Sequence, residues 1–405
     1  MRFALVVSFL STFQIYHQSA PYATMGFNMT KNELSLISVK LQFERTFTVL
    51  SACRRYSNAA CLDANALFLT IGAFLMLLPS CTFLCIGRLI AGVGVGIGFV
   101  AASVAIRDCT EFAQRQQVFL VAAIFFSGSA LFSGLIIFLR GISYFHFVFL
   151  LTLPSFLAVA IYLLNRHDYK EPEKDRSAII VDAQYALFNP RFLAFVLMAL
   201  NASIGVPIVL CFSSLIFVAV GIDEQRAAVL SITYPIVQIF VIFIANQLGE
   251  RSFLSRRKTI LYGYGFCLGI FFILLLTQVF ETLNTEKRIK AIASAFWFIV
   301  LAAATALPCN SAVCVITECF KSRNSLIRGT AQSRAFFWLL SALSCGTFLP
   351  MLLHGSLFTA LMPSFCLSLV CFVYILFVLP QDDELSSAVL DFQAGYGSTQ
   401  MTFLY

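Results

Sequence analysis

The sequence predicts an all-α polytopic membrane protein with about twelve transmembrane helices, and three observations support this prediction. Hydrophobic residues make up 60% of the 405 residues. Charged residues make up only 12%, whereas a soluble domain carries about 25%. The apolar residues also form long runs that match the thickness of a bilayer rather than one oversized core. Too few charges remain to build a water-facing surface.

Ten spans follow directly from these apolar runs. From Ala66 to Ile106 only Arg88 is charged. As one helix this stretch would be roughly 60 Å long, so we expect two helices with a turn near Pro79–Thr82. The other runs are Val118–Phe138, Ile142–Leu164, Phe192–Val220, Ala227–Leu248, Thr259–Phe280, Ala291–Ile316, Ala335–His354 and Leu357–Leu379. An eleventh span is predicted from Phe3 to Tyr16, extended toward Met25.

The stretch from Asn32 to Ala66 carries too many polar residues for a clear span: Lys40, Gln42, Glu44, Arg45, Arg54 and Arg55. We expect Asn32–Ser51 to be a degenerate second transmembrane helix. If it crosses the membrane, both termini are cytosolic; if it does not, the N-terminus is outside. From the third span onward the orientation follows from the basic residues, because 17 lie in gaps predicted to be cytosolic and 6 in the opposite gaps.

One hydrophilic stretch, Arg166–Asn189, divides the predicted spans into two groups of six. We therefore expect an N-terminal helical bundle at 1–165, a cytosolic linker at 166–190, a C-terminal helical bundle at 191–380 and a cytosolic tail at 381–405. Asn28-Met29-Thr30 is a glycosylation sequon in the first predicted external gap, which agrees with this orientation. The 13 cysteines lack zinc-ligand spacing, so no metal site is expected.

Acidic residues followed by arginines recur at three predicted cytosolic helix ends: Asp108 with Arg115, Glu318 with Arg323 and Arg328, and Glu250 and Arg251 with Arg256 and Arg257. Ion pairs at such an end can hold two helical bundles together and separate when the bundles rock apart. The alternative interpretation is that these arginines obey only the positive-inside rule.

The segment from Gly87-Arg88 to Gly96, followed by Asp108 and Arg115, resembles the fourth-span signature of the sugar porter family of the major facilitator superfamily. Further resemblances are Ser255-Arg256-Arg257, Glu318 with Arg328-Gly329-Thr330, and Pro380-Gln381. The family includes facilitative glucose transporters. The resemblance, which covers roughly Ala66 to Gln381, implies two six-helix bundles, a plasma-membrane location and hexose transport. It also implies a cytosolic gate formed by Arg88, Asp108, Arg115, Glu250, Arg251, Arg256, Arg257, Glu318 and Arg328.

The same resemblance implies polar substrate-binding residues near the membrane midplane, and the candidates are Asn201, Ser203, Gln238, Asn310 and Trp338. Gln238 stands where the eighth span supplies an amide in this family, and Trp338 corresponds to a tryptophan of the eleventh span. Other polar positions of the family are changed, for example to Ala123, Ala202 and Pro207. Each remaining amide can equally well form a hydrogen bond between helices.

No catalytic or cofactor motif accompanies these features. The histidines His17, His146, His167 and His354 are scattered, no phosphate-binding glycine loop occurs, and the basic residues do not form a nucleic-acid-binding face. Apart from Arg88, and from charges in the degenerate span, we expect no ionisable side chain inside a span, which favours facilitated diffusion over proton symport. The first hypothesis is a facilitator of a small organic solute, by default a hexose. The alternatives are a non-transporting sensor or decayed paralogue, and a carrier of a hydrophobic solute.

Overall fold

The computed structural model describes residues 2–12, 56–136, 143–169, 189–249, 255–279, 287–320 and 323–380, and all the secondary structure in these residues is helical. The elements are α1 (Arg2–Thr12), α3 (Asn58–Met76), α4 (Cys81–Cys109), α5 (Phe112–Ile136), α6 (Tyr144–Asn165), η2 (Arg166–Asp168), α7 (Pro190–Ser203), α8 (Val206–Ala219), α9 (Glu224–Gly249), α10 (Arg256–Val279), α11 (Lys287–Ala304), α12 (Ala306–Cys319), α13 (Arg323–His354) and α14 (Leu357–Val378).

Ten helical segments of the described residues are long and apolar enough to cross a membrane, and each overlaps one of the ten runs found in the sequence. The expected turn near Pro79 is present, because α3 ends at Met76 and α4 begins at Cys81. The eleventh predicted span begins as α1, which is described up to Thr12. The degenerate second span, the sequon at Asn28, most of the linker and the tail 381–405 lie outside the described residues.

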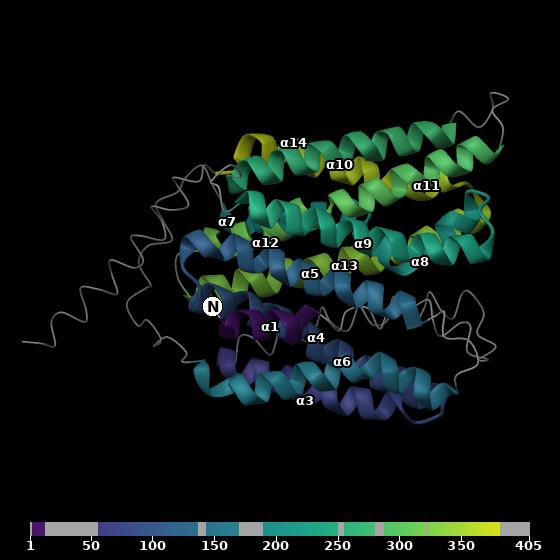
Figure 1. Cartoon of the computed structure of the whole chain (residues 1–405). Helices are drawn as coiled ribbons and strands as arrows, with labels where there is room; N and C mark the ends of the chain where they lie inside the picture. Colours follow the sequence, from purple (N-terminus) through teal and green to yellow (C-terminus); the bar gives the residue numbers. More distant parts are fainter. Residues whose placement is uncertain are drawn as a thin grey trace, which may run out of the picture.

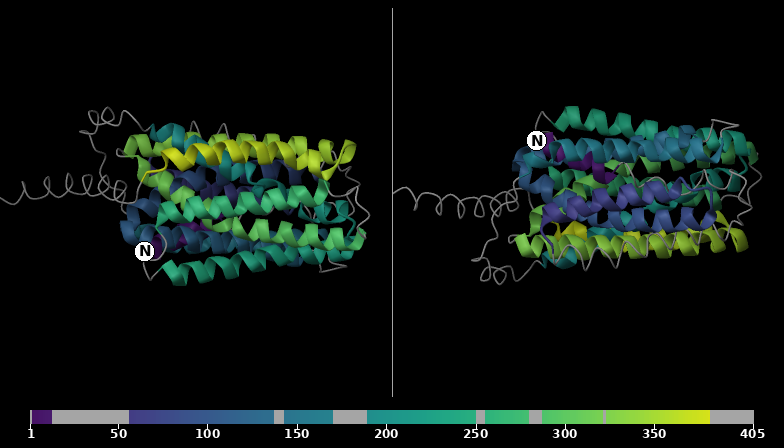
Figure 2. Two further views of the ribbon diagram at one scale, coloured as in Figure 1. Left: turned by 90° about the horizontal axis from the view of Figure 1, so that it is seen from above. Right: turned by 90° about the horizontal axis from the view of Figure 1, so that it is seen from below.

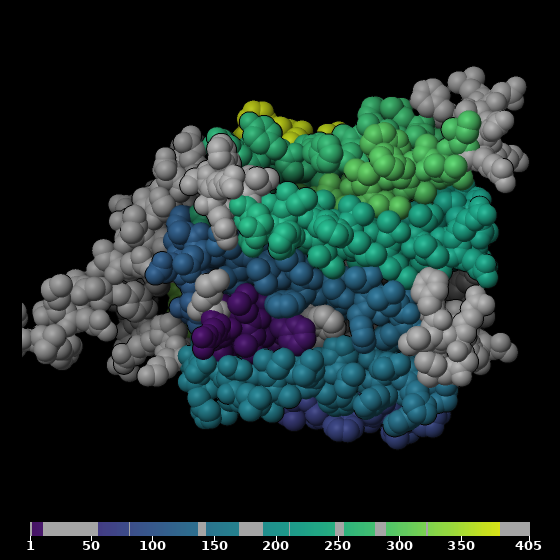
Figure 3. All heavy atoms as spheres, viewed as in Figure 1, coloured from purple at the N-terminus to yellow at the C-terminus, as the bar shows by residue number. Residues whose placement is uncertain are grey.

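The helices lie side by side along one common direction (Figure 1), and the views from above and below show the same arrangement (Figure 2). We call α1 and α3–α6 the N-terminal bundle and α7–α14 the C-terminal bundle. Helix α1 packs against α4, α5 and α6, and Figure 3 shows it between α5 and α6 on the surface. The bundles meet through α5 against α9 and α12, and through α13 against α4.

The outward faces of the helices are apolar, as expected for a chain surrounded by lipid. Phe377 is 83% exposed and Val370 is 68% exposed on α14, and Ile292 is 69% exposed on α11. The glycine-rich face of α4 has a different role, since it packs against α3 inside the N-terminal bundle. A Cβ atom built on Gly87 would lie 2.7 Å from the carbonyl oxygen of Gly72, so only glycine permits this approach.

Two predicted spans are broken helices. The run Phe192–Val220 forms α7 and α8, which are separated at Gly205 with φ 102°. The run Ala291–Ile316 forms α11 and α12, which are separated at Thr305. Continuous apolar composition gives no sign of either break, because a lone glycine or threonine is tolerated within a helical pattern. In transporters, discontinuous helices mark the region of the substrate site.

Gly205→Ala should lower the free energy of unfolding by about 1–2 kcal/mol, because an L-residue is strained at positive φ. Nothing lies within 4 Å of a Cβ built at Gly205, so the loss would come from the backbone conformation rather than from a clash. Gly269→Ala is the matched control, since Gly269 has equally open surroundings but lies inside α10, where alanine is favoured. Thermal unfolding in detergent compares the two variants, and equal melting temperatures would contradict the prediction.

Candidate functional site

A buried carboxylate at the end of α12 lies between two arginines. Glu318 Oε1 is 3.3 Å from Nη1 of Arg115 on α5, and Glu318 Oε2 is 3.3 Å from Nε of Arg256 on α10. The Glu318 side chain is 0% exposed, and the arginine side chains are 4% and 8% exposed. Because an unpaired charge is costly to remove from water, removal of any one of these three side chains would leave a buried charge without its partner.

A second ion pair also connects the bundles, but here the acid belongs to the N-terminal bundle and the arginine to the C-terminal bundle. Nη2 of Arg323, at the start of α13, is 3.2 Å from Oδ2 of Asp108, at the end of α4. An acid that ends a helix of each bundle therefore pairs with an arginine near the start of a helix of the other bundle. We call Asp108, Arg115, Arg256, Glu318 and Arg323 the ion-pair layer.

The turn between α4 and α5 holds the arginines of this layer in place. The guanidinium carbon of Arg256 lies 3.7 Å from the centroid of the Phe112 ring, and its Nη2 donates to the Phe112 carbonyl oxygen. Arg256 thus contacts the N-terminal bundle although it belongs to α10. Nη2 of Arg115 donates to the carbonyl oxygens of Thr110 at 3.2 Å and Arg107 at 3.4 Å. These contacts fix the direction in which each guanidinium meets Glu318.

The first residue after η2 extends the layer toward the linker. The Tyr169 hydroxyl donates to Oδ2 of Asp108 at 3.0 Å and accepts a hydrogen bond from Nδ2 of Asn58 at 2.9 Å. The Tyr169 ring stacks on Phe3 of α1, with 5.0 Å between the ring centroids. Burial, and secondly the negative charge of Asp108, raise the pKa of Tyr169, so the hydroxyl keeps its proton and remains a donor.

The structure brings four of the predicted gate residues together: Asp108, Arg115, Arg256 and Glu318. Arg323, and not the predicted Arg328, forms the ion pair with Asp108. Arg323 is the first residue of α13, and Arg328 is exposed. The acid–arginine motif at Glu318 contains both arginines, so the motif itself could not separate them. The neighbour of Arg256, Arg257, is only partly buried.

The placement of Arg88 in the gate is wrong. It lies on α4, twenty residues before Asp108, which corresponds to about 30 Å along the helix. The sequence already indicated this distance, because Arg88 stands near the start of the long predicted helix whereas Asp108 stands at its end. The last two predicted gate residues, Glu250 and Arg251, lie outside the described residues.

Gln238 of α9, a candidate for substrate binding, forms hydrogen bonds to both bundles. Its Oε1 accepts from the Ser127 hydroxyl of α5 at 2.9 Å, and its Nε2 donates to the Ala302 carbonyl oxygen of α11 at 2.6 Å. The residue is 7% exposed. Gln238 therefore lies where the bundles meet, and its amide already has two partners in this conformation.

Two of the other polar candidates form hydrogen bonds to neighbouring helices, and the third bonds within its own helix. Asn201 of α7 donates to the Cys309 carbonyl oxygen at 3.3 Å and accepts from the Tyr264 hydroxyl. Ser203 accepts from the hydroxyl of Ser368 on α14 at 2.9 Å. The partly exposed Asn310 donates to the Ala306 carbonyl oxygen of its own helix at 2.7 Å.

Trp338, the remaining candidate, lies on α13 close to Arg334. The sequence predicts Arg334 to lie in a cytosolic gap. The indole of Trp338 is 4% exposed and lies 6.2 Å from the ring of Phe99 on α4, measured between centroids. One turn earlier, the guanidinium carbon of Arg334 lies 4.7 Å from the centroid of the same ring. The span was predicted to begin at Ala335, but α13 begins at Arg323, so Arg334 is inside the helix and 7% exposed.

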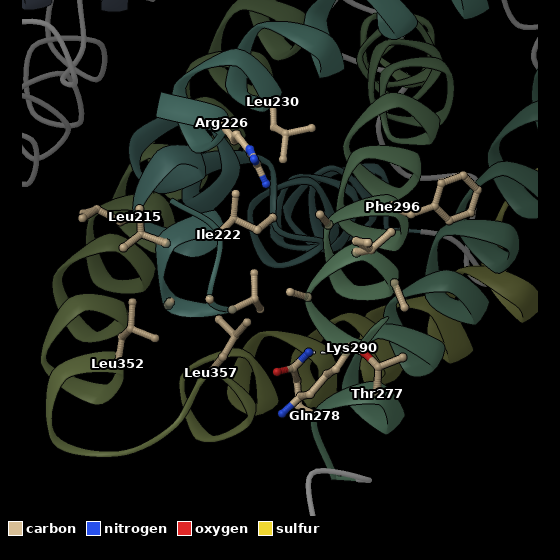
Figure 4. Close-up of a pocket in the computed structure, with 18 of the residues that line it drawn as sticks. Leu215, Ile222, Arg226, Leu230, Thr277, Gln278, Lys290, Phe296, Leu352 and Leu357 are labelled. Carbon is tan, nitrogen blue, oxygen red and sulfur yellow. Dashed lines mark hydrogen bonds between the residues drawn. The ribbon is translucent and has the colours of Figure 1, made fainter. Parts of the chain in front are cut away.

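A cavity of 2120 Å³ lies in the C-terminal bundle at the end opposite to the ion-pair layer. Figure 4 shows Ile222 and Arg226 on one side of it, Gln278 and Lys290 on another, and Leu357 near a third. Arg226, Lys290 and Leu357 belong to the starts of α9, α11 and α14, Gln278 to the end of α10, and Ile222 to the segment between α8 and α9. Glu318 instead ends α12. Among the described side chains, no group of three His, Cys, Asp or Glu residues could hold a metal ion.

Comparisons with known proteins agree with this architecture. The family model of the Major Facilitator Superfamily matches residues 63–317, more than half of the chain. Similar solved structures include the transporter FucP in the outward conformation, with 15% identity, a TM-score of 0.65 and coverage of 93% of this chain and 98% of that one. The proton:xylose symporter XylE bound to 6-bromo-6-deoxy-D-glucose has 13% identity, a TM-score of 0.72 and coverage of 94% and 95%.

XylE from E. coli in a partially occluded inward-open conformation has 12% identity, a TM-score of 0.66 and coverage of 94% and 97%. At these identities the likeness shows the fold alone. No curated protein sequence matches the chain. The family model and the shared fold together show that this chain belongs to the major facilitator superfamily.

Proposed function

We propose that this protein moves a small organic solute across a membrane by alternating access, with a hexose as the default solute and facilitated diffusion as the mode. The observation that carries the proposal is the reciprocal pairing of Asp108 with Arg323 and of Glu318 with Arg115. Such pairs close one end of the molecule with contacts that are lost when the bundles separate. A two-state rocking equilibrium needs a contact of this kind.

The opposite end supports the same proposal. There the C-terminal bundle contains the 2120 Å³ cavity, which is larger than the roughly 300–1,000 Å³ of a typical ligand pocket. The end with the ion-pair layer has a much smaller cavity, of 180 Å³ beside Arg256, so the two ends differ in how far they are hollowed. The basic residues counted in the sequence favour a cytosolic location for the ion-pair layer. If the second span crosses the membrane, both termini are cytosolic and Asn28 is external, where a glycan can be attached. A plasma-membrane location is supported by the resemblance to the sugar porter family.

Facilitated diffusion is favoured by the positions of the carboxylates. The buried carboxylate of Glu318 and the partly buried one of Asp108 lie in the ion-pair layer and are paired with arginines. The described part of α1 contains no acidic residue. Among the described residues, no carboxylate remains in the middle of a span to carry a proton, a group that proton coupling usually requires.

A non-transporting sensor or decayed paralogue is the second candidate function. Asn201, Ser203 and Gln238 all form hydrogen bonds between helices, which is the role expected of polar residues in a bundle that binds no solute. The two functions predict different behaviour in a reconstituted membrane.

The purified protein in liposomes should take up labelled glucose or fructose with saturable kinetics. A panel of non-sugar solutes, together with liposomes that contain no protein, provides the comparison. Saturable uptake without an imposed proton gradient supports facilitated diffusion, whereas uptake that depends on the gradient would contradict it. The absence of flux for every solute would contradict transport and favour the sensor.

A further inference from the structure

Two buried arginines of the described residues, Arg88 and Arg334, lie outside the ion-pair layer, and Arg334 is the one whose guanidinium lies against an aromatic ring of the other bundle. Arg334 follows Arg323 by eleven residues on α13, which places it about 16 Å deeper along the helix. Eleven residues are close to three full turns, so both arginines lie on the face of α13 that meets the N-terminal bundle. Arg334 is 7% exposed.

No described carboxylate neutralises this cation. The carboxylates of the ion-pair layer are engaged elsewhere, Glu318 with Arg115 and Arg256, and Asp108 with Arg323. The contact that the structure records for the Arg334 guanidinium among the described residues is with the ring of Phe99, at 4.7 Å. A cation–π contact offsets only part of the cost of burying a charge. A buried cation without a counter-anion in a membrane bundle indicates a functional site.

The surroundings of Arg334 are those of the predicted solute site. Trp338 is one turn away and contacts the same Phe99 ring, with 6.2 Å between centroids. Since Phe99 and Arg334 belong to different bundles, separation of the bundles would uncover the guanidinium to a solute.

We propose that Arg334 binds the carboxylate of a small organic monoanion of hexose size, such as a sugar acid. The inference rests on the proposed function and narrows its solute from a neutral hexose to a hexose-sized carboxylate. The planar guanidinium binds a carboxylate through two parallel hydrogen bonds, which gives both charge and geometric selectivity. The indole of Trp338 then provides an apolar surface beside the carbon chain of the solute.

Binding of D-gluconate and D-glucose to the purified protein in detergent tests this proposal, because the two probes have the same carbon number but differ in charge. We expect gluconate to bind at least about tenfold more tightly than glucose. Arg334→Gln should remove this preference by weakening gluconate binding at least about tenfold, whereas Arg334→Lys, which keeps the charge, should retain part of it. Lys258→Gln is the control, since it removes an exposed cation from α10.

Equal binding of gluconate by the wild-type protein and Arg334→Gln would overturn the proposal, as would tighter binding of glucose. If Arg334→Gln does not fold, the comparison between wild type and Arg334→Lys decides, and an unchanged gluconate affinity would count against bidentate recognition at Arg334.

Uptake in liposomes separates the proposal for Arg334 from the proposed transport function. Gluconate binding without flux of any solute would overturn transport but leave the Arg334 site, whereas glucose uptake that gluconate does not inhibit would overturn the Arg334 site alone.

Discussion

Glu318→Ala should weaken the closed state of the ion-pair layer by about 3–5 kcal/mol, the largest effect expected of any single substitution here. The change leaves the guanidinium groups of Arg115 and Arg256 buried without their carboxylate. Both arginines regain water if the bundles separate at this end, so the variant should favour the open arrangement. A shift of this size would change the ratio of the two states by more than a hundredfold.

Hydrogen–deuterium exchange measures this opening without introduced labels. Backbone amides at the starts of α5 and α13 should exchange faster in Glu318→Ala than in the wild type, and KM for efflux and influx should diverge. Asp223→Ala is the matched control, because it removes a carboxylate from an exposed pair with Arg226, where less than about 1 kcal/mol is expected. Unchanged exchange in Glu318→Ala would refute the assignment of the layer as a gate.

Gln238→Ala should abolish solute uptake and lower the free energy of unfolding by about 1–2 kcal/mol. The loss of uptake is expected because Gln238 is a candidate for solute binding that lies where α5, α9 and α11 meet. The loss of stability is expected because the hydroxyl of Ser127 and the carbonyl group of Ala302 would lose a buried partner. Liposome uptake and thermal unfolding measure the two effects separately.

Ser127→Ala separates solute binding from helix packing at this position. It removes the same hydrogen bond between the bundles, which measures 2.9 Å, but keeps the amide of Gln238. If Gln238 binds the solute, Ser127→Ala should retain most of the uptake at a similar stability. Equal loss of uptake in the two variants would show that the contact between helices, and not the amide, is required.

The spans could be predicted because the bilayer restricts their length and composition. A helix that crosses it needs about 20 apolar residues, and charges are confined to the gaps. The ten clear runs therefore became ten membrane-length segments of the structure. The acid–arginine motifs were found in the same way, since Asp108 and Glu318 stand at helix ends next to apolar runs.

The partners in the ion-pair layer could not be predicted from these motifs. Arg323 and Arg328 belong to the same segment, and only the direction in which the first turn of α13 faces α4 selects Arg323. In the same way, the breaks at Gly205 and Thr305 leave the apolar composition unchanged. The depth of Arg334 was missed because α13 extends twelve residues beyond the N-terminal limit of its apolar run.

By itself, the sequence determined that this protein is a polytopic membrane protein, how many clear spans it has and which helix ends carry paired charges. These properties follow from local composition, since each span meets the lipid on its own. Only the tertiary structure decided which charges pair across the bundles, that Asn201 and Gln238 bridge helices and that Arg334 is buried beside Phe99. These contacts join residues far apart in the chain, and their geometry depends on the rotation and depth of each helix, which composition does not specify.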